Sequence, residues 1–167
     1  AGTGGTTTYV APALPADRVE YCFTDISPLF VNRAKERFAS YPFMRYEVLD
    51  IEQDPMRQGF PARRYDVVVA ANVLHATRDL RETLRNVGKL VAPGGLLVLV
   101  EVATRQRWID LTFGLLDGWW RFADAELRPS YPLLSHERWI ALLEEMGFEP
   151  GIKIPRAAEG RGNDDIT

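Results

Sequence analysis

The sequence has very little cysteine and no long hydrophobic run. Cys22 is the only cysteine among the 167 residues, so neither an intrachain disulfide nor a thiolate metal cluster can form. A small buried side chain is the simplest role for this thiol, and a reducing, cytoplasmic environment fits the composition. No apolar stretch approaches the ~20 residues that a membrane-spanning helix needs, and no secretory signal is visible at the N-terminus.

The chain also lacks a concentration of charge of one sign. Its formal net charge is −3, and acidic and basic residues are interspersed. No dense basic stripe is present, so nucleic-acid binding has little electrostatic support. With 46% hydrophobic residues, a chain of this length suits one domain with a buried core.

Strand and helix patterns alternate along the chain. Runs rich in β-branched and aromatic residues predict strands at 19–24, 45–49, 65–71, 96–102 and 148–154. Helical spacing predicts helices at 28–38, 79–91 and 135–146. The continuous apolar run at 65–71 is typical of a central strand covered on both faces. The alternation predicts an α/β fold with a doubly wound, mostly parallel, Rossmann-like sheet.

The two ends of the chain are atypical for such a fold. The chain opens on a glycine loop, Gly2-Thr-Gly4-Gly5, with no strand before it. We therefore interpret the sequence as a fragment of something longer, or as its ordered part, truncated at the first strand. We assign residues 1–156 to the core and the polar residues 157–167 to a flexible tail.

Polar residues or glycines stand at four successive strand ends. The glycine loop precedes a helix, and Asp25, Asp50 and Asn72 each follow a predicted strand. Ligands of open α/β sheets bind beyond the carboxyl ends of the strands, where a carboxylate can accept both hydroxyls of a ribose. Taken singly, each residue could be a turn residue or a helix cap; together they indicate a nucleoside-type ligand. The predicted cofactor-binding residues are Gly2, Thr3, Gly4, Asp25, Ile26, Asp50, Ile51, Asn72 and Val73.

Two nucleoside cofactors compete for this site. A dinucleotide site would favour a Gly-x-Gly-x-x-Gly loop, but position 7 of this loop is Thr7. A candidate base also follows the fourth strand end, and an insertion follows the next. These features point away from hydride transfer and towards S-adenosylmethionine.

A base and a carboxylate follow two neighbouring buried runs. His75 lies just beyond the strand at 65–71, and Glu101 lies at the end of the strand at 96–102. This placement predicts a catalytic pair at the ligand-binding edge. His75 could instead be a capping or core histidine, and Glu101 could form a buried salt bridge with Arg105 or Arg107.

Residues 104–134 interrupt the alternation of strands and helices with an aromatic-rich insertion. Insertions after strand ends often build substrate specificity. We predict a hydrophobic substrate pocket that includes Phe113, Trp119, Trp120 and Tyr131. The alternative is that these aromatic residues pack as core.

Several motifs together resemble one enzyme family. They are Ala-Gly-Thr-Gly-Gly-Thr-Thr at 1–7, Phe-Thr-Asp-Ile-Ser at 23–27, Leu-Asp-Ile at 49–51, Asn-Val-Leu-His-Ala-Thr at 72–77, Leu-Val-Ala-Pro-Gly-Gly at 90–95 with Glu-Val at 101–102, and Leu-Asp-Gly-Trp-Trp at 116–120 with Tyr-Pro-Leu-Leu-Ser at 131–135. The chain resembles class I S-adenosylmethionine-dependent methyltransferases, and within them the C-methyltransferase domains of polyketide synthases. The likeness spans about residues 1–149, and its Asn-Val-Leu-His-Ala-Thr and Gly-Trp-Trp pieces are the more specific ones.

The resemblance implies a reaction and a setting. It implies methylation of the α-carbon of a β-ketoacyl thioester on an acyl carrier protein, with His75 as general base oriented by Glu101, S-adenosylmethionine as donor and no metal. It also implies neighbouring synthase domains as partners, with no nucleic acid and no membrane. Family domains carry an N-terminal lid and a first strand before the glycine loop. We therefore expect the chain as written to bind the cofactor weakly and to turn over little or not at all.

Three other functions compete with this interpretation. An O- or N-methyltransferase of a small natural product would share the cofactor site, and a histidine base also suits a hydroxyl. A non-catalytic scaffold domain of a synthase is a second alternative, although the intact His75 and glycine loop argue against it. A nicotinamide-dependent Rossmann enzyme is the third, and the loop pattern disfavours it.

Overall fold

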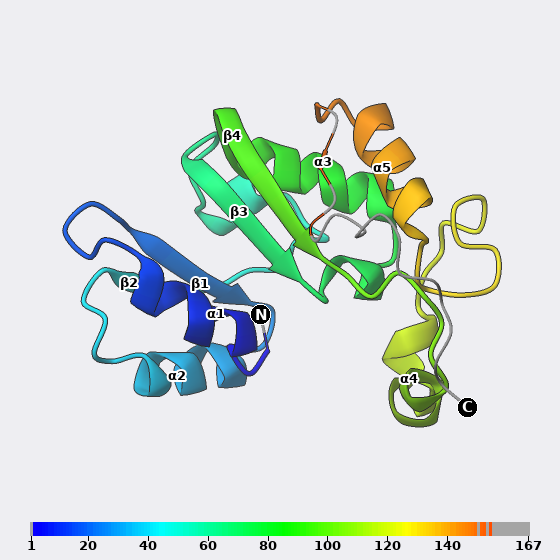
Figure 1. The fold of residues 1–167 in the computed structure, drawn as a ribbon, viewed down its shortest axis with the longest axis horizontal. Helices are drawn as coiled ribbons and strands as arrows, with labels where there is room; N and C mark the ends of the chain where they lie inside the picture. Colours follow the sequence, from blue (N-terminus) through cyan, green and yellow to red (C-terminus); the bar gives the residue numbers. More distant parts are fainter. Residues whose placement is uncertain (1, 150, 153, 155–167) are drawn as a thin grey trace, which may run out of the picture.

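The computed structural model describes residues 2–149, 151, 152 and 154, which form two strand pairs with helices packed against them (Figure 1). The first pair comprises β1 (Tyr21–Asp25) and β2 (Met44–Val48), which are parallel. Helix α2 (Pro28–Arg37) connects them, and α1 (Gly5–Val10) with the short helix η1 (Ala11–Ala13) precedes them. A small core holds this part together, built from Ala11, Phe23, Ala34, Phe38 and Met44.

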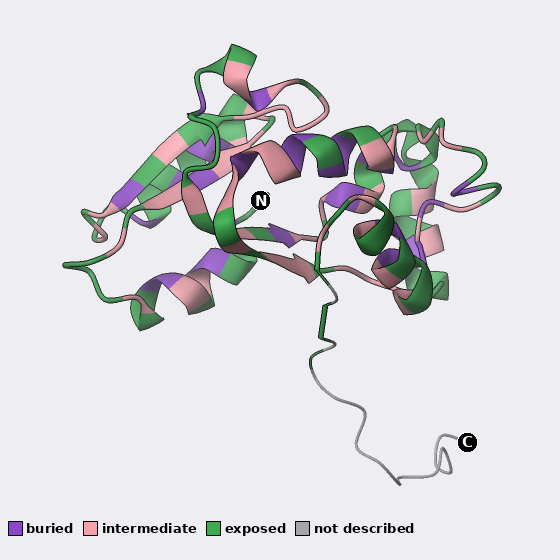
Figure 2. Cartoon of the chain, turned by 90° about the horizontal axis from the view of Figure 1, so that it is seen from above, coloured by how far each residue is buried: buried purple, intermediate pink, exposed green. Residues whose placement is uncertain are grey.

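The second pair comprises β3 (Tyr65–Ala71) and β4 (Val91–Val100), also parallel. The short helices η2 (Pro55–Gln58) and η3 (Leu74–Ala76) flank β3, and α3 (Leu80–Leu90) leads into β4. Helices α3 and α5 (His136–Glu145) share the larger core, and the buried residues of α3 lie along one side of the helix (Figure 2). That core is made of Ala70, Leu74, Leu80, Leu84, Val87, Leu127, Leu134, Trp139 and Leu142.

The sequence correctly predicted an α/β fold with parallel strands, but the strands do not join into one sheet. Within the described ranges no strand lies between β1 and β3. Residues of both strands line a cavity of about 640 Å³. The cavity lies beside the edges of β1 and β3 that do not pair with another described strand.

Two predictions about the second pair were wrong. Strand β4 begins at Val91 rather than 96, because the Pro-Gly-Gly segment forms an irregularity inside the strand, between the Tyr65–Val91 and Val67–Leu96 pairings. Strand β3 is not covered on both faces: the side chains of Val67 and Val69 are exposed, while Ala70 is buried against the helices. Helices α3 and α5 cover one face, and composition alone does not reveal what covers the other.

The expected strand at 148–154 does not form over the described residues of that segment. Helix α5 ends at Glu145, Gly147 follows with φ +84°, and the N–H of Phe148 donates to the carbonyl of Leu143. This hydrogen bond closes the helix end, so Phe148 packs against the larger core instead of starting a ladder. Residues 150, 153 and the predicted tail at 157–167 lie outside the described residues.

The aromatic insertion is helical in part. It contains α4 (Arg107–Thr112) and two short helices, η4 (Phe113–Leu115) and η5 (Asp117–Trp120). Several of its apolar side chains, including Leu111 and Leu115, are exposed. None of the helices in the described ranges has the length and hydrophobicity needed to cross a bilayer.

Gly4 offers a direct test of the N-terminal loop. Its φ is +77°, and a Cβ placed on it would lie 2.8 Å from Cε2 of Phe38. Left-handed backbone costs an alanine ~1–2 kcal/mol, and the clash in the core adds ~1–3 kcal/mol. We therefore expect Gly4→Ala to lower the midpoint of urea unfolding clearly.

The matched control is Gly5→Ala, at the start of α1. A Cβ on Gly5 meets nothing within 4 Å, so this variant should keep or slightly raise the midpoint. Equal midpoints for the two variants would contradict the packing of Gly4 against Phe38.

Candidate active site

The N-terminal loop folds back onto the end of β1. The N–H of Gly2 donates to Oδ2 of Asp25 at 2.6 Å, and the N–H of Ser27 donates to Oδ1 at 2.9 Å. Partial burial works to raise the pKa of Asp25, hydrogen bonds such as these two work to lower it, and the net pKa lies below its usual range. Asp25 is therefore an ionised acceptor at neutral pH, fixed at the carboxyl end of β1.

The turn after β2 is held by side-chain hydrogen bonds. Asp50 accepts from the N–H of Glu52 at 3.0 Å, and the side chain of Gln58 bonds to both the N–H and the carbonyl of Asp50 at 2.8 Å. Asn86 of α3 donates to the carbonyl of Ile51 at 3.0 Å. These bonds fix the turn beside the second strand pair.

Asn72 directly follows β3 and has a left-handed conformation, with φ +49°. Its N–H donates to the carbonyl of Val100 at 2.7 Å, and its side-chain oxygen accepts from the N–H of Val102 at 3.2 Å. Asparagine tolerates this backbone conformation better than most residues. The side chain thus ties the carboxyl ends of β3 and β4 together.

A single cavity gathers nearly all the predicted cofactor residues. Its lining includes Gly2, Thr3, Asp25, Ile26, Asp50, Ile51, Asn72 and Val73. Gly4 is the exception, because it faces Phe38 rather than the cavity. Sequence reasoning missed further lining residues whose types carry no specific signal, among them Thr6, Thr7, Leu49, Phe60 and Thr77.

His75 and Glu101 meet at the carboxyl ends of β3 and β4. Nδ1 of His75 lies 2.6 Å from Oε2 of Glu101, and the two side chains are 11% and 4% exposed. The other carboxylate oxygen, Oε1, accepts from the N–H groups of Val73 and Leu74 at 3.1 and 2.9 Å. Glu101 therefore holds both the imidazole ring and the backbone just before it.

The sequence left open whether Glu101 pairs with His75 or with an arginine, and the structure pairs it with His75. Among the described residues Glu101 pairs with His75 and with neither Arg105 nor Arg107, and Nε of Arg105 pairs with Asp110 at 2.8 Å. With Nδ1 directed at Glu101, Nε2 of His75 has no hydrogen-bond partner among the described residues. This nitrogen is the one left for chemistry.

An aromatic cluster of the insertion contacts His75 through Trp119. The ring of Trp119, which is 8% exposed, lies edge-on to the imidazole with centroids 5.4 Å apart. Phe113 stacks on Trp119 at 5.9 Å, and Tyr131 contacts it at 6.1 Å. Trp120 joins through Tyr131 and is half exposed. All four predicted pocket residues therefore form one cluster, with Trp119 nearest the base.

A polar group within this cluster was not predicted. The Tyr131 hydroxyl donates to Oδ1 of Asp110 at 2.6 Å, and the Arg105 guanidinium lies over the Tyr131 ring. Burial, together with the Asp110 carboxylate, raises the pKa of Tyr131 to about 12. The hydroxyl therefore stays protonated at physiological pH.

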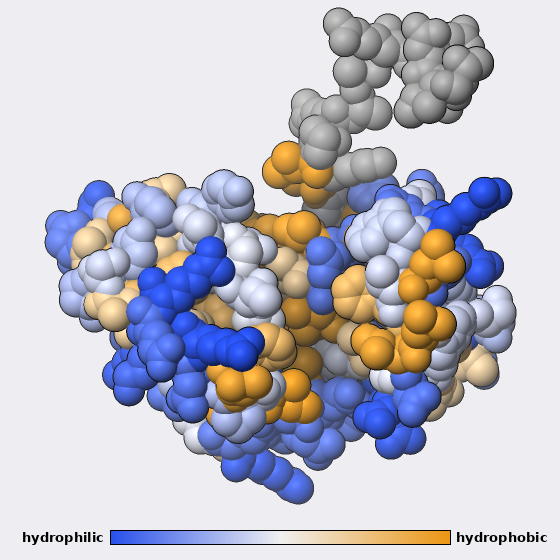
Figure 3. Space-filling view, turned by 90° about the horizontal axis from the view of Figure 1, so that it is seen from below, coloured by the Kyte–Doolittle hydropathy of each residue, from blue (hydrophilic) through white to orange (hydrophobic). Residues whose placement is uncertain are grey.

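Figure 3 shows hydrophobic side chains in and beside a hollow that opens between the N-terminal part and the insertion.

Known proteins resemble this chain strongly. Residues 1–97 match the family described as a methyltransferase domain. The polyketide synthase ThaQ of Burkholderia thailandensis is 48% identical over 167 residues, which cover 97% of this chain and 8% of the synthase. The methyltransferase calH of Penicillium decumbens is 45% identical over 154 residues, covering 89% of this chain and 42% of calH.

Two solved structures of methyltransferases are also similar to this chain. The CurJ carbon methyltransferase superposes with a TM-score of 0.87 and 55% identity, covering 91% of this chain and 42% of that one. The trans-methyltransferase CalH, in complex with SAH, gives a TM-score of 0.82 and 45% identity, covering 89% of this chain and 43% of that one. The chain thus spans less than half of each of these four relatives.

Proposed function

This chain belongs to the methyltransferase domain family, and we propose that it methylates the α-carbon of a β-ketoacyl thioester held on an acyl carrier protein. The observation that carries the proposal is the buried His75–Glu101 pair beside the cavity of predicted cofactor residues. Similarity to a carbon methyltransferase and to polyketide synthases supports carbon as the acceptor and neighbouring synthase domains as partners.

The cavity suits S-adenosylmethionine in size and chemistry. Its volume of about 640 Å³ falls within the ~300–1,000 Å³ of small-molecule sites. The ionised carboxylate of Asp25 can accept hydrogen bonds from ribose hydroxyls, and the carboxylate of Asp50, at the next strand end, can accept one from an adenine edge. When bound, S-adenosylmethionine supplies a methyl group on a positively charged sulfur, so the proposed chemistry requires no metal.

The proton transfer rests on His75 and Glu101. The α-proton of a β-ketoacyl thioester lies between two carbonyls and is fairly acidic, so a neutral imidazole can remove it. Nε2 of His75 accepts this proton, which leaves the α-carbon as a nucleophile. Glu101 keeps the hydrogen of the neutral ring on Nδ1 and stabilises the imidazolium that forms, by the logic of a hydrolase triad.

The direct test uses the full-length natural protein with S-adenosylmethionine and a β-ketoacyl thioester. Mass spectrometry and NMR of the product report how many methyl groups are added and on which atom. A methyl group on the α-carbon supports the proposal. A methyl group on oxygen or nitrogen would indicate a small-molecule O- or N-methyltransferase, and cofactor binding without transfer would indicate a scaffold domain.

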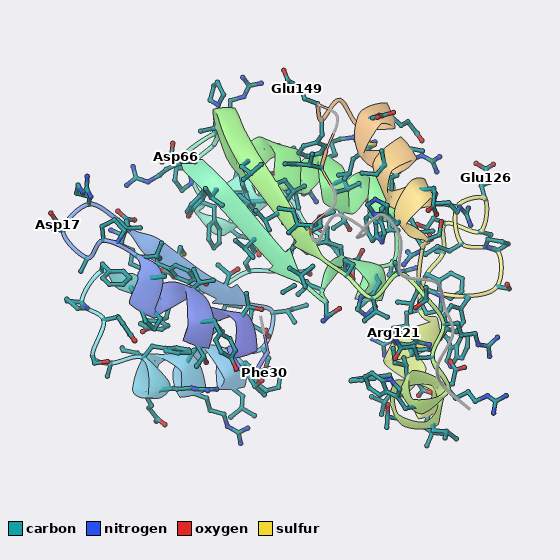
Figure 4. All side chains as sticks on the ribbon, viewed as in Figure 1. Asp17, Phe30, Asp66, Arg121, Glu126 and Glu149 are labelled. Atoms are coloured by element: carbon teal, nitrogen blue, oxygen red, sulfur yellow. The ribbon has the colours of Figure 1, made fainter. Side chains whose placement is uncertain are left out.

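Asp25 provides a test of the cofactor site alone. Asp25→Ala should weaken S-adenosylmethionine binding by roughly 10–100-fold, because hydrogen bonds to a charged group contribute ~1.5–3 kcal/mol. Isothermal titration calorimetry measures the Kd. Asp17→Ala is the matched control, since the Asp17 side chain is 83% exposed at the tip of a loop outside the cavity (Figure 4). Equal affinities for the two variants would contradict a role for Asp25 in binding.

A further inference from the structure

Arg128 is a buried charge that the proposed reaction does not use. It is 0% exposed and lies within the aromatic insertion, in the irregular segment between η5 and α5. Burying a guanidinium is unfavourable unless its donors are satisfied. Its Nε donates to Oδ1 of Asp124 at 2.6 Å, and the Asp124 side chain is 3% exposed.

The remaining nitrogens of Arg128 all bond to one loop. Nη1 donates to the carbonyl of His75 at 2.7 Å. Nη2 donates to the carbonyls of Thr77 and Arg78 at 2.7 and 3.1 Å. The first carbonyl lies within the 3₁₀ turn η3, the other two follow it, and none of them belongs to the strand ladders. A single guanidinium therefore satisfies three backbone carbonyls within residues 75–78, just beyond β3.

Asp124 extends this arrangement to the next helix. Its second oxygen, Oδ2, accepts from the N–H of Leu80 at 3.0 Å, at the first residue of α3. The N–H of Ala123 also donates to the carbonyl of Arg78 at 2.8 Å. The Arg128–Asp124 pair thus fixes the whole connection from His75 to the start of α3.

The loop is therefore held at two sides by two different charges. Glu101 accepts from the N–H groups of Val73 and Leu74, before the histidine, and Arg128 donates to carbonyls at and after it. Glu101 orients the imidazole ring, while Arg128 fixes the backbone from which that ring projects. Neither anchor can replace the other, because one binds donors and the other binds acceptors.

We propose that Arg128 is a positioning residue that holds His75 in place for proton removal. The proposal rests on the role of His75 given above. Lysine cannot substitute, because three carbonyls and a carboxylate arranged around a planar fork need the guanidinium geometry. Misplacing a reacting group by about 1 Å can cost about 100-fold in rate.

The test is Arg128→Lys in the full-length natural protein. We expect kcat to fall about 100-fold, with S-adenosylmethionine affinity and the KM for the thioester within about threefold of wild type. The urea midpoint is measured beside them, and rates are taken where the variant is fully folded. Arg81→Lys is the matched control: Arg81 forms a two-bond pair with Glu145 on an exposed surface, so its loss should leave kcat unchanged.

A double variant separates positioning from a general structural role. If Arg128 acts through His75, adding Arg128→Lys to His75→Ala should not lower the residual rate further. An Arg128→Lys variant with wild-type kcat, or one that slows the His75→Ala protein by the same factor as the wild type, would overturn the proposal. If His75→Ala alone leaves the rate unchanged, the proposed base is wrong. That result concerns the proposed function and can be told apart from the two results that would overturn the role of Arg128.

Discussion

Replacing His75 with alanine is expected to lower the rate of α-carbon methylation by about 10²–10⁴-fold, the usual contribution of a positioned general base. Nε2 of His75 is the only ring nitrogen left for the proton, since Nδ1 is directed at Glu101. Cofactor affinity should remain, because His75 does not line the cavity of predicted cofactor residues. Product formation by mass spectrometry and cofactor binding by calorimetry measure the two effects separately.

His136 supplies the control for this substitution. It is the only other histidine of the chain, it begins α5, and it is not among the hydrogen-bond partners of His75 or Glu101. His136→Ala should therefore keep the wild-type rate. A normal rate in the His75→Ala protein would remove the base from the mechanism, and a parallel loss of cofactor binding would show that the substitution disturbs the site as a whole.

The sequence predicted the chemical pair better than it predicted the surroundings. His75 and Glu101 stood at the ends of two consecutive buried runs, and parallel strands bring such ends to one edge. That topological rule was enough to place the two side chains together. The residues that hold the pair were not predictable in this way. Arg128 and Asp124 lie in an irregular segment without periodicity, and the backbone carbonyls that Arg128 contacts leave no trace in the residue types.

Glycine and apolar patterns were less informative about position. Gly4 was assigned to the cofactor because glycine permits close approach, but its missing Cβ makes room for Phe38. The run at 65–71 was assigned to a strand covered on both faces, yet Val67 and Val69 are exposed. In both cases the residue type reflects its surroundings: Gly4 has no room for a side chain, and the strand at 65–71 packs against helices on one face. The sequence did not specify which neighbouring residues create those surroundings.

Changing Glu101 to glutamine is expected to slow methylation by up to about 10⁴-fold, the loss that follows when a triad carboxylate becomes an amide. The glutamate and glutamine side chains have nearly the same shape, so the substitution changes mainly the hydrogens available for bonding. If the amide oxygen keeps its bonds to the N–H groups of Val73 and Leu74, the NH₂ group must donate to Nδ1 of His75. The ring hydrogen then moves to Nε2, which can no longer accept a proton.

The reverse orientation of the amide does not restore the site. It would direct the NH₂ group at the N–H groups of Val73 and Leu74, leaving donors facing donors beside a nearly buried side chain. Glutamine is therefore a sharper test than alanine, which would also remove both backbone acceptors. Glu126→Gln, at an exposed glutamate in the irregular segment between η5 and α5, is the matched control and should keep the wild-type rate (Figure 4). A Glu101→Gln protein within a few-fold of wild type would mean that the hydrogen on the ring is not set by this carboxylate. A Glu101→Gln, His75→Ala double variant no slower than His75→Ala would place the whole effect of Glu101 on the imidazole.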